Sequence, residues 1–229
     1  MGQLNNKILG DSSGRVGNIV FRERGDQVYI SKRPRKNKNR IVSDLAKAVR
    51  EKFGLTVAVC KEINAADLLK SGWTADAANA KSKFNKIFQA NYKAIGTVDA
   101  PGKPILLPST GFPIENGVIT LTQTGFTVSA EAPGAGSGVN STIEKDIIGV
   151  GVVIMTNPTD VTLPKFKVAK VMTGMQSLDT DAPINLAYSF TGDPLSEFGL
   201  YTTKQVSLTL ITVDNLGHRI NNSVTFKNA

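Results

Sequence analysis

The sequence contains very few of the residues from which catalytic and metal centres are usually built. It has one cysteine, Cys60, and one histidine, His218. A single cysteine excludes a disulfide framework within the chain, and a single histidine excludes a multi-histidine metal site. Long apolar runs are also missing. The longest, "IIGVGVVIM" (Ile147 to Met155), has nine residues and is too short to span a bilayer as a helix. The segment "MGQLNNKILG" has no apolar stretch of signal-peptide length, so we expect neither export nor a membrane span.

Short motifs that could indicate enzymatic chemistry are incomplete. "GDSSG", from Gly10 to Gly14, is similar to a serine-protease motif, but its position at the N-terminus favours a glycine-rich turn. "PGAGSG" fails the dinucleotide-binding pattern because Val139 stands where the third glycine should be. The acidic groups "DTDAP" and "EKD" offer too few oxygen ligands for a hard cation. We therefore predict a protein that is not an enzyme and that holds no metal and no cofactor.

Positive charge is concentrated in the first quarter of the chain. The net charge is +8, and residues 1–52 carry thirteen Lys and Arg against five Asp and Glu, a difference of +8. Residues 53–229 carry fourteen of each, so they contribute no net charge. A chain polarised in this way is typical of a protein with one surface or arm that binds an anionic partner.

Residues 1–40 are predicted to form a β-hairpin that continues into a basic arm. Two β-rich runs flank "RERGDQ", in which Gly25-Asp26 suits a tight turn. The segment "SKRPRKNKNR" that follows has six positive charges and no apolar residue, so we expect it to be exposed and extended. The candidate residues for binding nucleic acid or a partner are Arg15, Arg22, Arg24, Lys32, Arg33, Arg35, Lys36, Lys38 and Arg40. The candidate subunit-interface residues are Val16, Ile19, Phe21 and Tyr29.

Residues 41–99 are predicted to form an antiparallel pair of helices. Apolar residues recur there at three-, four- and seven-residue spacings, which indicates one apolar stripe that includes Cys60. "KSGW" interrupts the stripe at Gly72, and Thr74 is placed to cap the second helix, with Trp73 folded back as a staple. Cys60 is therefore interpreted as a small core residue and not as a nucleophile.

Residues 100–229 are predicted to form an immunoglobulin-like antiparallel β-sandwich, which gives the whole chain the α+β class. About seven short β-rich runs alternate with Gly, Pro, Asn and Asp clusters, a pattern typical of sandwiches. The Cys…Trp…Cys pattern of antibody domains is absent, so the prediction concerns the architecture alone. "APGKP", from Ala100 to Pro104, is the predicted domain boundary.

The opening "KILGDSSGRVGNIVFRERGDQVYISKRPRKNKN", followed by the helix "FNKIFQANYKAI" and a β-rich domain, resembles an uncharacterised family of Bacteroidota and phage proteins. Those proteins open with an LGxxSGKVGNVV-like stretch and a short basic Arg-Pro segment. The resemblance covers the whole chain, and its specific part is the first 40 residues. Arg15 stands where the family has lysine, which keeps the charge. The resemblance supports the architecture and implies no activity.

Three interpretations of the basic arm remain open. It is a solvated linker, a sequence-nonspecific contact for nucleic acid, or an arm that docks on a neighbouring subunit. Because no aromatic residue lies between its charges, the arm offers no base stacking. A basic arm, a small helical part and a β-sandwich without catalytic residues together favour a structural subunit, such as a phage capsid, vertex or tail component in a homo-oligomer or with other virion proteins. The alternative is a nucleic-acid-associated protein of the bacterial cytoplasm.

Overall fold

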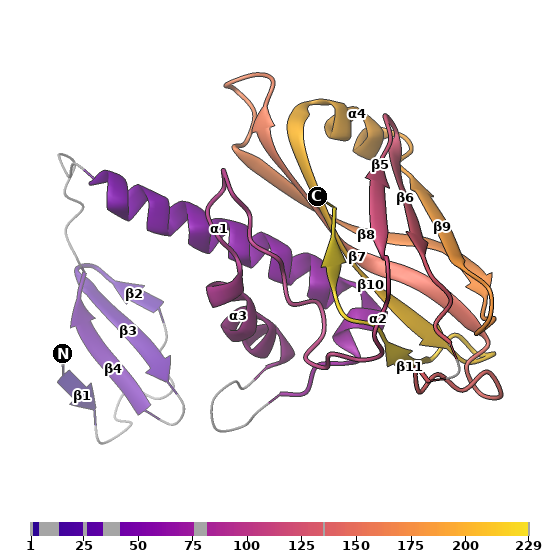
Figure 1. Ribbon diagram of the computed structural model, residues 1–229. Helices are drawn as coiled ribbons and strands as arrows, with labels where there is room; N and C mark the ends of the chain where they lie inside the picture. Colours follow the sequence, from indigo (N-terminus) through magenta and orange to yellow (C-terminus); the bar gives the residue numbers. More distant parts are fainter. Residues whose placement is uncertain are drawn as a thin grey trace. The chain divides into compact units, whose positions relative to one another are not determined.

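The computed structural model describes residues 2–4, 14–24, 27–33, 42–75, 82–134 and 136–228. These residues form helices and antiparallel sheets, which confirms the α+β class (Figure 1). The chain divides into two compact units, Met1–Ser43 and Asp44–Ala229. Each unit has its own sheet structure and is described separately.

The first unit is a four-stranded antiparallel sheet with the order β1-β4-β3-β2. Its strands are β1 (Gly2–Leu4), β2 (Gly14–Val16), β3 (Ile19–Arg24) and β4 (Gln27–Lys32). The predicted hairpin is the β3–β4 pair, whereas its turn at Gly25-Asp26 lies outside the described residues. Strands β2 and β3 are joined by Gly17 and Asn18, and Gly17 has a φ of 57°, which favours glycine.

The second unit begins with the predicted helices, now bounded as α1 (Asp44–Ala65), α2 (Asp67–Lys70) and α3 (Lys83–Ala94). The helical run ends at Ser71 and Gly72, as the sequence predicted. The predicted cap is wrong: Ser82 caps α3 and accepts a hydrogen bond from the Asn85 amide at 3.2 Å. Trp73 does not act as a staple for that helix start. It is buried in the core, where its indole Nε1 donates to the Leu106 carbonyl at 2.9 Å.

Two antiparallel sheets follow. The large one has the order β11-β10-β7-β8, with β12 also paired to β10, and the small one has the order β5-β6-β9. Each strand overlaps a run that the sequence predicted as β-rich, but β8 continues past the end of its predicted run and β10 begins before its predicted start. Their bounds are Val118–Leu121 (β5), Gly125–Ala130 (β6), Asp146–Pro158 (β7), Phe166–Ser177 (β8), Ile184–Ser189 (β9), Tyr201–Val213 (β10), Arg219–Asn222 (β11) and Phe226–Lys227 (β12). The short helix α4 (Asp193–Gly199) was not predicted.

Strand β7 separates two hydrophobic clusters, because successive side chains of a strand point to opposite faces of its sheet. Ile148, Val150, Val152 and Ile154 pack with α1, α3 and the segment around Leu106. Ile147, Val153 and Met155 pack with the small sheet. The second unit therefore has three layers, with helices on one face of the large sheet and the small sheet on the other (Figure 1).

This layering differs from the predicted division of the chain at Ala100–Pro101. The compact units divide at Ser43–Asp44, and residues 44–229 stay together. The reason is that the helices share a cluster of buried side chains with one face of the large sheet, so the helices have no separate core of their own. The switch from helix to strand near residue 100 marks a change of secondary structure within one unit.

Candidate functional site

The two faces of the N-terminal sheet differ in chemistry. The β3–β4 register pairs Phe21 with Ile30 and Ile19 with Lys32, and these residues lie on one face. We call Ile19, Phe21 and Ile30 the apolar sheet face. The same register pairs Arg22 with Tyr29 and places Val20 opposite Ser31, on the other face. One face can therefore bury against an apolar surface while the other presents a guanidinium beside a phenol ring.

The N-terminal sheet has no buried core within its described part. None of its residues with a described exposure is buried, and the Ile19 side chain is 45% exposed. Both hydrophobic clusters of the described chain begin only at Leu55 or later. A sheet with an apolar face gains stability by covering that face with another layer. The apolar sheet face is therefore a candidate docking surface.

The predicted basic residues are only partly described. Arg22, Lys32 and Arg33 are exposed, and the Arg33 amide donates to the Asn18 carbonyl at 2.8 Å, which ties the start of the arm to the sheet. In the backbone register Arg15 lies opposite Val20, and Arg24 opposite Gln27. The predicted arm residues Arg35, Lys36, Lys38 and Arg40 lie outside the described residues.

The predicted interface residues lie on two faces of the N-terminal sheet. Ile19 and Phe21 share a face, and Val16 lies opposite Ile19 in the register. Tyr29 lies on the other face, paired with Arg22. A flat partner surface therefore contacts either Ile19 and Phe21 or Tyr29, but not all of them. The predicted turn at Gly25-Asp26 already implies this register, so the separation could have been found by counting back from the turn along both strands.

The two residues with catalytic potential do not form a reactive site. Cys60 is fully buried on α1, and burial raises the pKa of its thiol to about 12, which keeps it protonated. His218 lies in the exposed turn between β10 and β11, as predicted, and its Nδ1 lies 3.2 Å from Oδ2 of Asp214. Asp214 also accepts hydrogen bonds from the amides of Leu216 and His218, both at 2.8 Å. This arrangement closes a turn, and the His218 side chain is largely exposed.

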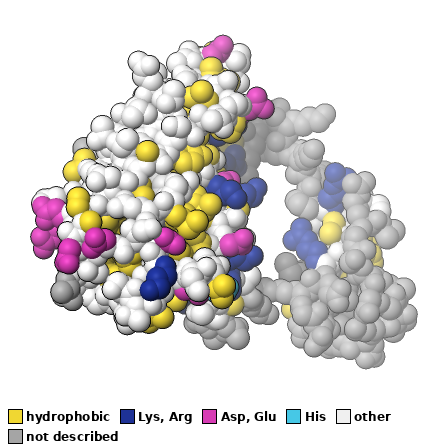
Figure 2. Space-filling model, turned by 90° about the vertical axis from the view of Figure 1, so that its right-hand side faces the viewer, with side chains coloured by type: hydrophobic (Ala, Val, Ile, Leu, Met, Phe, Trp, Pro, Cys, Tyr) yellow, Lys and Arg dark blue, Asp and Glu magenta, His cyan; other side chains and the backbone are white. Residues whose placement is uncertain are grey.

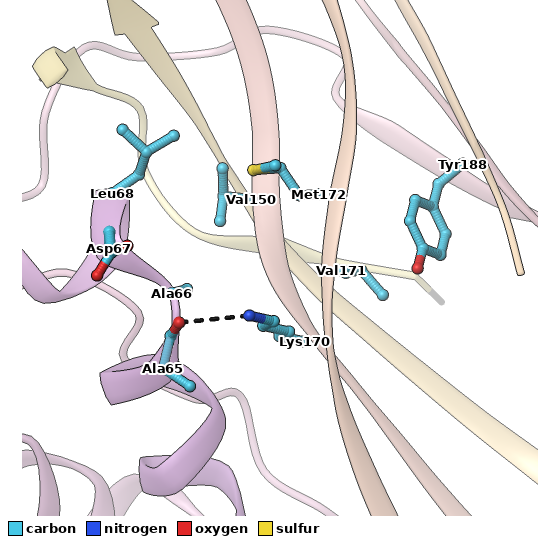
Figure 3. A pocket seen from close by; sticks show the side chains of 9 residues that line it. All are labelled: Ala65, Ala66, Asp67, Leu68, Val150, Lys170, Val171, Met172 and Tyr188. Carbon is cyan, nitrogen blue, oxygen red and sulfur yellow. Dashed lines mark hydrogen bonds between the residues drawn. The ribbon is translucent and has the colours of Figure 1, made fainter. Parts of the chain in front are cut away.

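One pocket of about 390 Å³ lies between the α1–α2 junction and strands β8 and β9 (Figure 3). Its wall is largely apolar, with Asp67, Lys170 and Tyr188 as the polar members. The Lys170 ammonium donates to the Ala65 carbonyl at 3.4 Å, and the Lys170 amide donates to Glu62 at 3.1 Å. Burial raises the pKa of Tyr188, so its hydroxyl stays protonated. No sequence pattern indicated this pocket, because its residues come from four separate segments of the chain.

The remaining described residues were searched for charged patches, metal sites and membrane-spanning helices. On the face of the second unit shown in Figure 2, both signs of charge occur, and hydrophobic side chains form a broken band among uncharged ones. Within the described ranges, no group of three or more His, Cys, Asp or Glu side chains could hold a metal ion. No helix in the described part of the chain is long and apolar enough to cross a membrane.

Comparison with family models, with curated proteins and with solved structures gives no match for this chain. The resemblance of the N-terminal segment to the Bacteroidota family remains a prediction from the residues quoted above.

Proposed function

We propose that this chain is a non-enzymatic structural subunit of a phage virion, a capsid, vertex or tail component that docks on neighbouring subunits through its N-terminal unit. The observation that carries the proposal is the N-terminal sheet, which has an apolar face and no buried core among its described residues. Such a sheet is stabilised by a partner that covers it. The remaining β-rich unit has the two facing antiparallel sheets of a sandwich, and we assign it to the immunoglobulin-like class as part of this proposal.

The environments of Cys60 and His218, the candidate nucleophile and the candidate base, support a non-enzymatic role in this proposal. The Cys60 thiol is buried and protonated, and the His218 ring is engaged with Asp214 in a turn. A Cys60→Ala, His218→Ala double variant should therefore retain the function of the wild-type protein.

A sequence-nonspecific contact with nucleic acid is the second candidate function, because Arg22 is exposed and is paired with Tyr29 on the face opposite the apolar one. A guanidinium beside an aromatic ring can bind phosphate and stack on a base. If all six basic residues of the arm also contacted phosphates, log affinity against log salt would slope by at most roughly −5 on duplex DNA. With this second function, the protein would be found in the bacterial cytoplasm or bound to packaged nucleic acid.

The deciding experiment is sedimentation of the tagged full chain from cells that produce the corresponding particles. The wild type and the Cys60→Ala, His218→Ala control should sediment with the particles, whereas a variant lacking residues 1–43 should not. A variant in which the six arm residues are changed to Gln should lose only part of its association, because the apolar sheet face remains. Particles that form without the wild-type chain, together with salt-sensitive DNA binding by the purified chain, would replace the structural proposal with the second candidate.

A further inference from the structure

The pocket between the α1–α2 junction and strands β8 and β9 has an apolar floor and a charged rim (Figure 3). Val150 and Val171 line the pocket and are each 1% exposed, whereas Asp67 and Lys170 line it and are exposed. Its volume of about 390 Å³ falls within the range of small-molecule sites, roughly 300–1,000 Å³. All of its residues belong to the second unit, so the pocket is complete within one compact part of the chain.

The Lys170 ammonium stands at the rim without a carboxylate partner among the described residues. It donates one hydrogen bond, to the Ala65 carbonyl at 3.4 Å, which is longer than the usual N–H···O distance of about 2.7–3.2 Å. The nearby Glu62 carboxylate accepts from the Lys170 amide at 3.1 Å, which holds the backbone beneath this side chain. The ammonium can therefore exchange its weak bond for one to an anionic group of a ligand.

The Asp67 carboxylate is the second charged group of the rim. The Asp67 carbonyl accepts from the Ser71 amide at 2.9 Å, but no side chain in the described ranges donates to the carboxylate or forms an ion pair with it. Asp67 and Lys170 thus line one pocket with opposite charges that are not paired with each other. A ligand that carries both an ammonium and a carboxylate complements both charges, whereas an acid or an amine alone complements only one.

The apolar part of the pocket can cover a large apolar group. Leu68 of α2 and Met172 of β8 stand beside Val150 and Val171, and Met172 is 56% exposed. In Figure 3 the Lys170 side chain extends towards the α1–α2 junction, and Tyr188 lies beyond Val171. A flexible thioether adapts to the shape of what it contacts, so Met172 can close over an apolar group. The floor and the rim together fit a molecule with one apolar end and one doubly charged end.

We propose that this pocket binds a free α-amino acid with a large apolar side chain, such as leucine. The carboxylate of the amino acid pairs with Lys170, and its ammonium pairs with Asp67. Its side chain packs on Val150, Val171 and Met172, where burial of apolar surface supplies the remaining affinity. This binding function is additional to the proposed assembly role, because none of these residues belongs to the N-terminal unit.

The test follows the methionine methyl groups of the full chain by NMR after selective carbon-13 labelling. The chain has four methionines, so each signal can be assigned by a Met→Leu change. Met172 lines the pocket, whereas Met155 is buried in the cluster on the other face of the large sheet. Leucine is titrated first. Isocaproate and isoamylamine keep its apolar body but lack the ammonium or the carboxylate, and glycine keeps both charges but lacks the side chain.

Leucine should shift the Met172 signal in a saturable manner and leave the Met155 signal unchanged. Isocaproate, isoamylamine and glycine should each bind about tenfold or more weakly than leucine, because each lacks one of the three contacts.

Two variants assign the charges. Lys170→Gln should weaken leucine binding about tenfold and remove the preference for leucine over isoamylamine, since the carboxylate has lost its partner. Asp67→Asn should weaken leucine binding to a similar extent and remove the preference for leucine over isocaproate. The matched controls are Lys61→Gln and Asp181→Asn, which change exposed charges outside the pocket and should leave binding unchanged. If a variant loses its circular dichroism melting transition, the ligand series on the wild type decides alone.

Each other outcome overturns the inference. A Met172 signal that does not shift at leucine concentrations up to about 10 mM excludes a site of useful affinity. Isocaproate or isoamylamine that binds as tightly as leucine shows that the pocket does not recognise a zwitterion. Leucine binding that both folded variants retain at full strength places the ligand elsewhere. None of these results affects the sedimentation of the chain with particles, which tests the proposed function separately.

Discussion

Removal of the helices should unfold the β-rich part of this protein, although the sequence alone places a domain boundary at residue 100. The helical layer covers apolar side chains on one face of the large sheet. Those on β7 and β10 are Ile148, Val150, Val152, Ile154, Ile211 and Val213. At about 1.5–3 kcal/mol for burying each such side chain, these six account for roughly 9–18 kcal/mol. Leu106 and Leu107 would stay in the shortened chain and keep part of that cover. Even half of the total, about 5–9 kcal/mol, is comparable with the whole stability of a typical domain, about 5–15 kcal/mol.

The assay compares two fragments, residues 44–229 and residues 100–229, by thermal and urea unfolding followed by circular dichroism. The longer fragment should unfold in one cooperative transition, because it contains every residue of both clusters. The shorter fragment should show no cooperative transition. A shorter fragment that unfolds cooperatively, with a midpoint close to that of the longer one, would refute the shared core and restore the boundary near Ala100. Limited proteolysis gives an independent reading, since a stable product should begin near Asp44 and not near residue 100.

Two further predictions concern titratable groups. Burial raises the pKa of the Cys60 thiol to about 12, so the folded protein should not react with a thiol reagent at pH 8. In denaturant the chain should react with one equivalent of the reagent. Full labelling of the folded chain would contradict the burial of Cys60. The hydrogen bond from the His218 amide is the main cause that lowers the pKa of Asp214 in the folded state. The ionised Asp214 carboxylate therefore stabilises the folded state fully above about pH 4, and this stabilisation is lost as the pH falls through the lowered pKa. The melting temperatures of the wild type and Asp214→Ala should therefore differ most near neutral pH and converge towards pH 2, and a constant difference would show that the carboxylate is not the cause.

The sequence predicted the secondary structure well where the periodicity was strong. The helical spacing around Cys60 and the β-rich runs from Val118 onward gave elements of the right type in the right order. Helix α4 was overlooked, although Asp193 and Pro194 directly after Gly192 form a helix-start signal. The cap of α3 was misplaced because Thr74 and Ser82 are equally suitable capping residues, and only the structure shows which of them meets an amide.

Tertiary relations were harder to predict, since they depend on pairings between distant segments. A strand buried on both faces, such as β7, reads as a plain apolar run, so the sequence did not show that one of its faces belongs to the helices. The positions of Arg22 and Tyr29 relative to Ile19 are an exception, because they follow from the hairpin register that the predicted turn at Gly25-Asp26 implies. Leu45, Val49 and Phe53 fitted the helical pattern, but the sequence could not show that these three side chains are exposed while the buried residues of α1 begin only at Leu55.

The location of the two clusters bears on the proposal that the N-terminal unit binds a partner. Every buried apolar residue of the described chain lies at Leu55 or later, and both hydrophobic clusters consist of residues of the second unit. Those residues nevertheless carry most of the arginines and an apolar sheet face. Exposed apolar and charged side chains that contribute nothing to the core of their own chain have their energetic effect in binding.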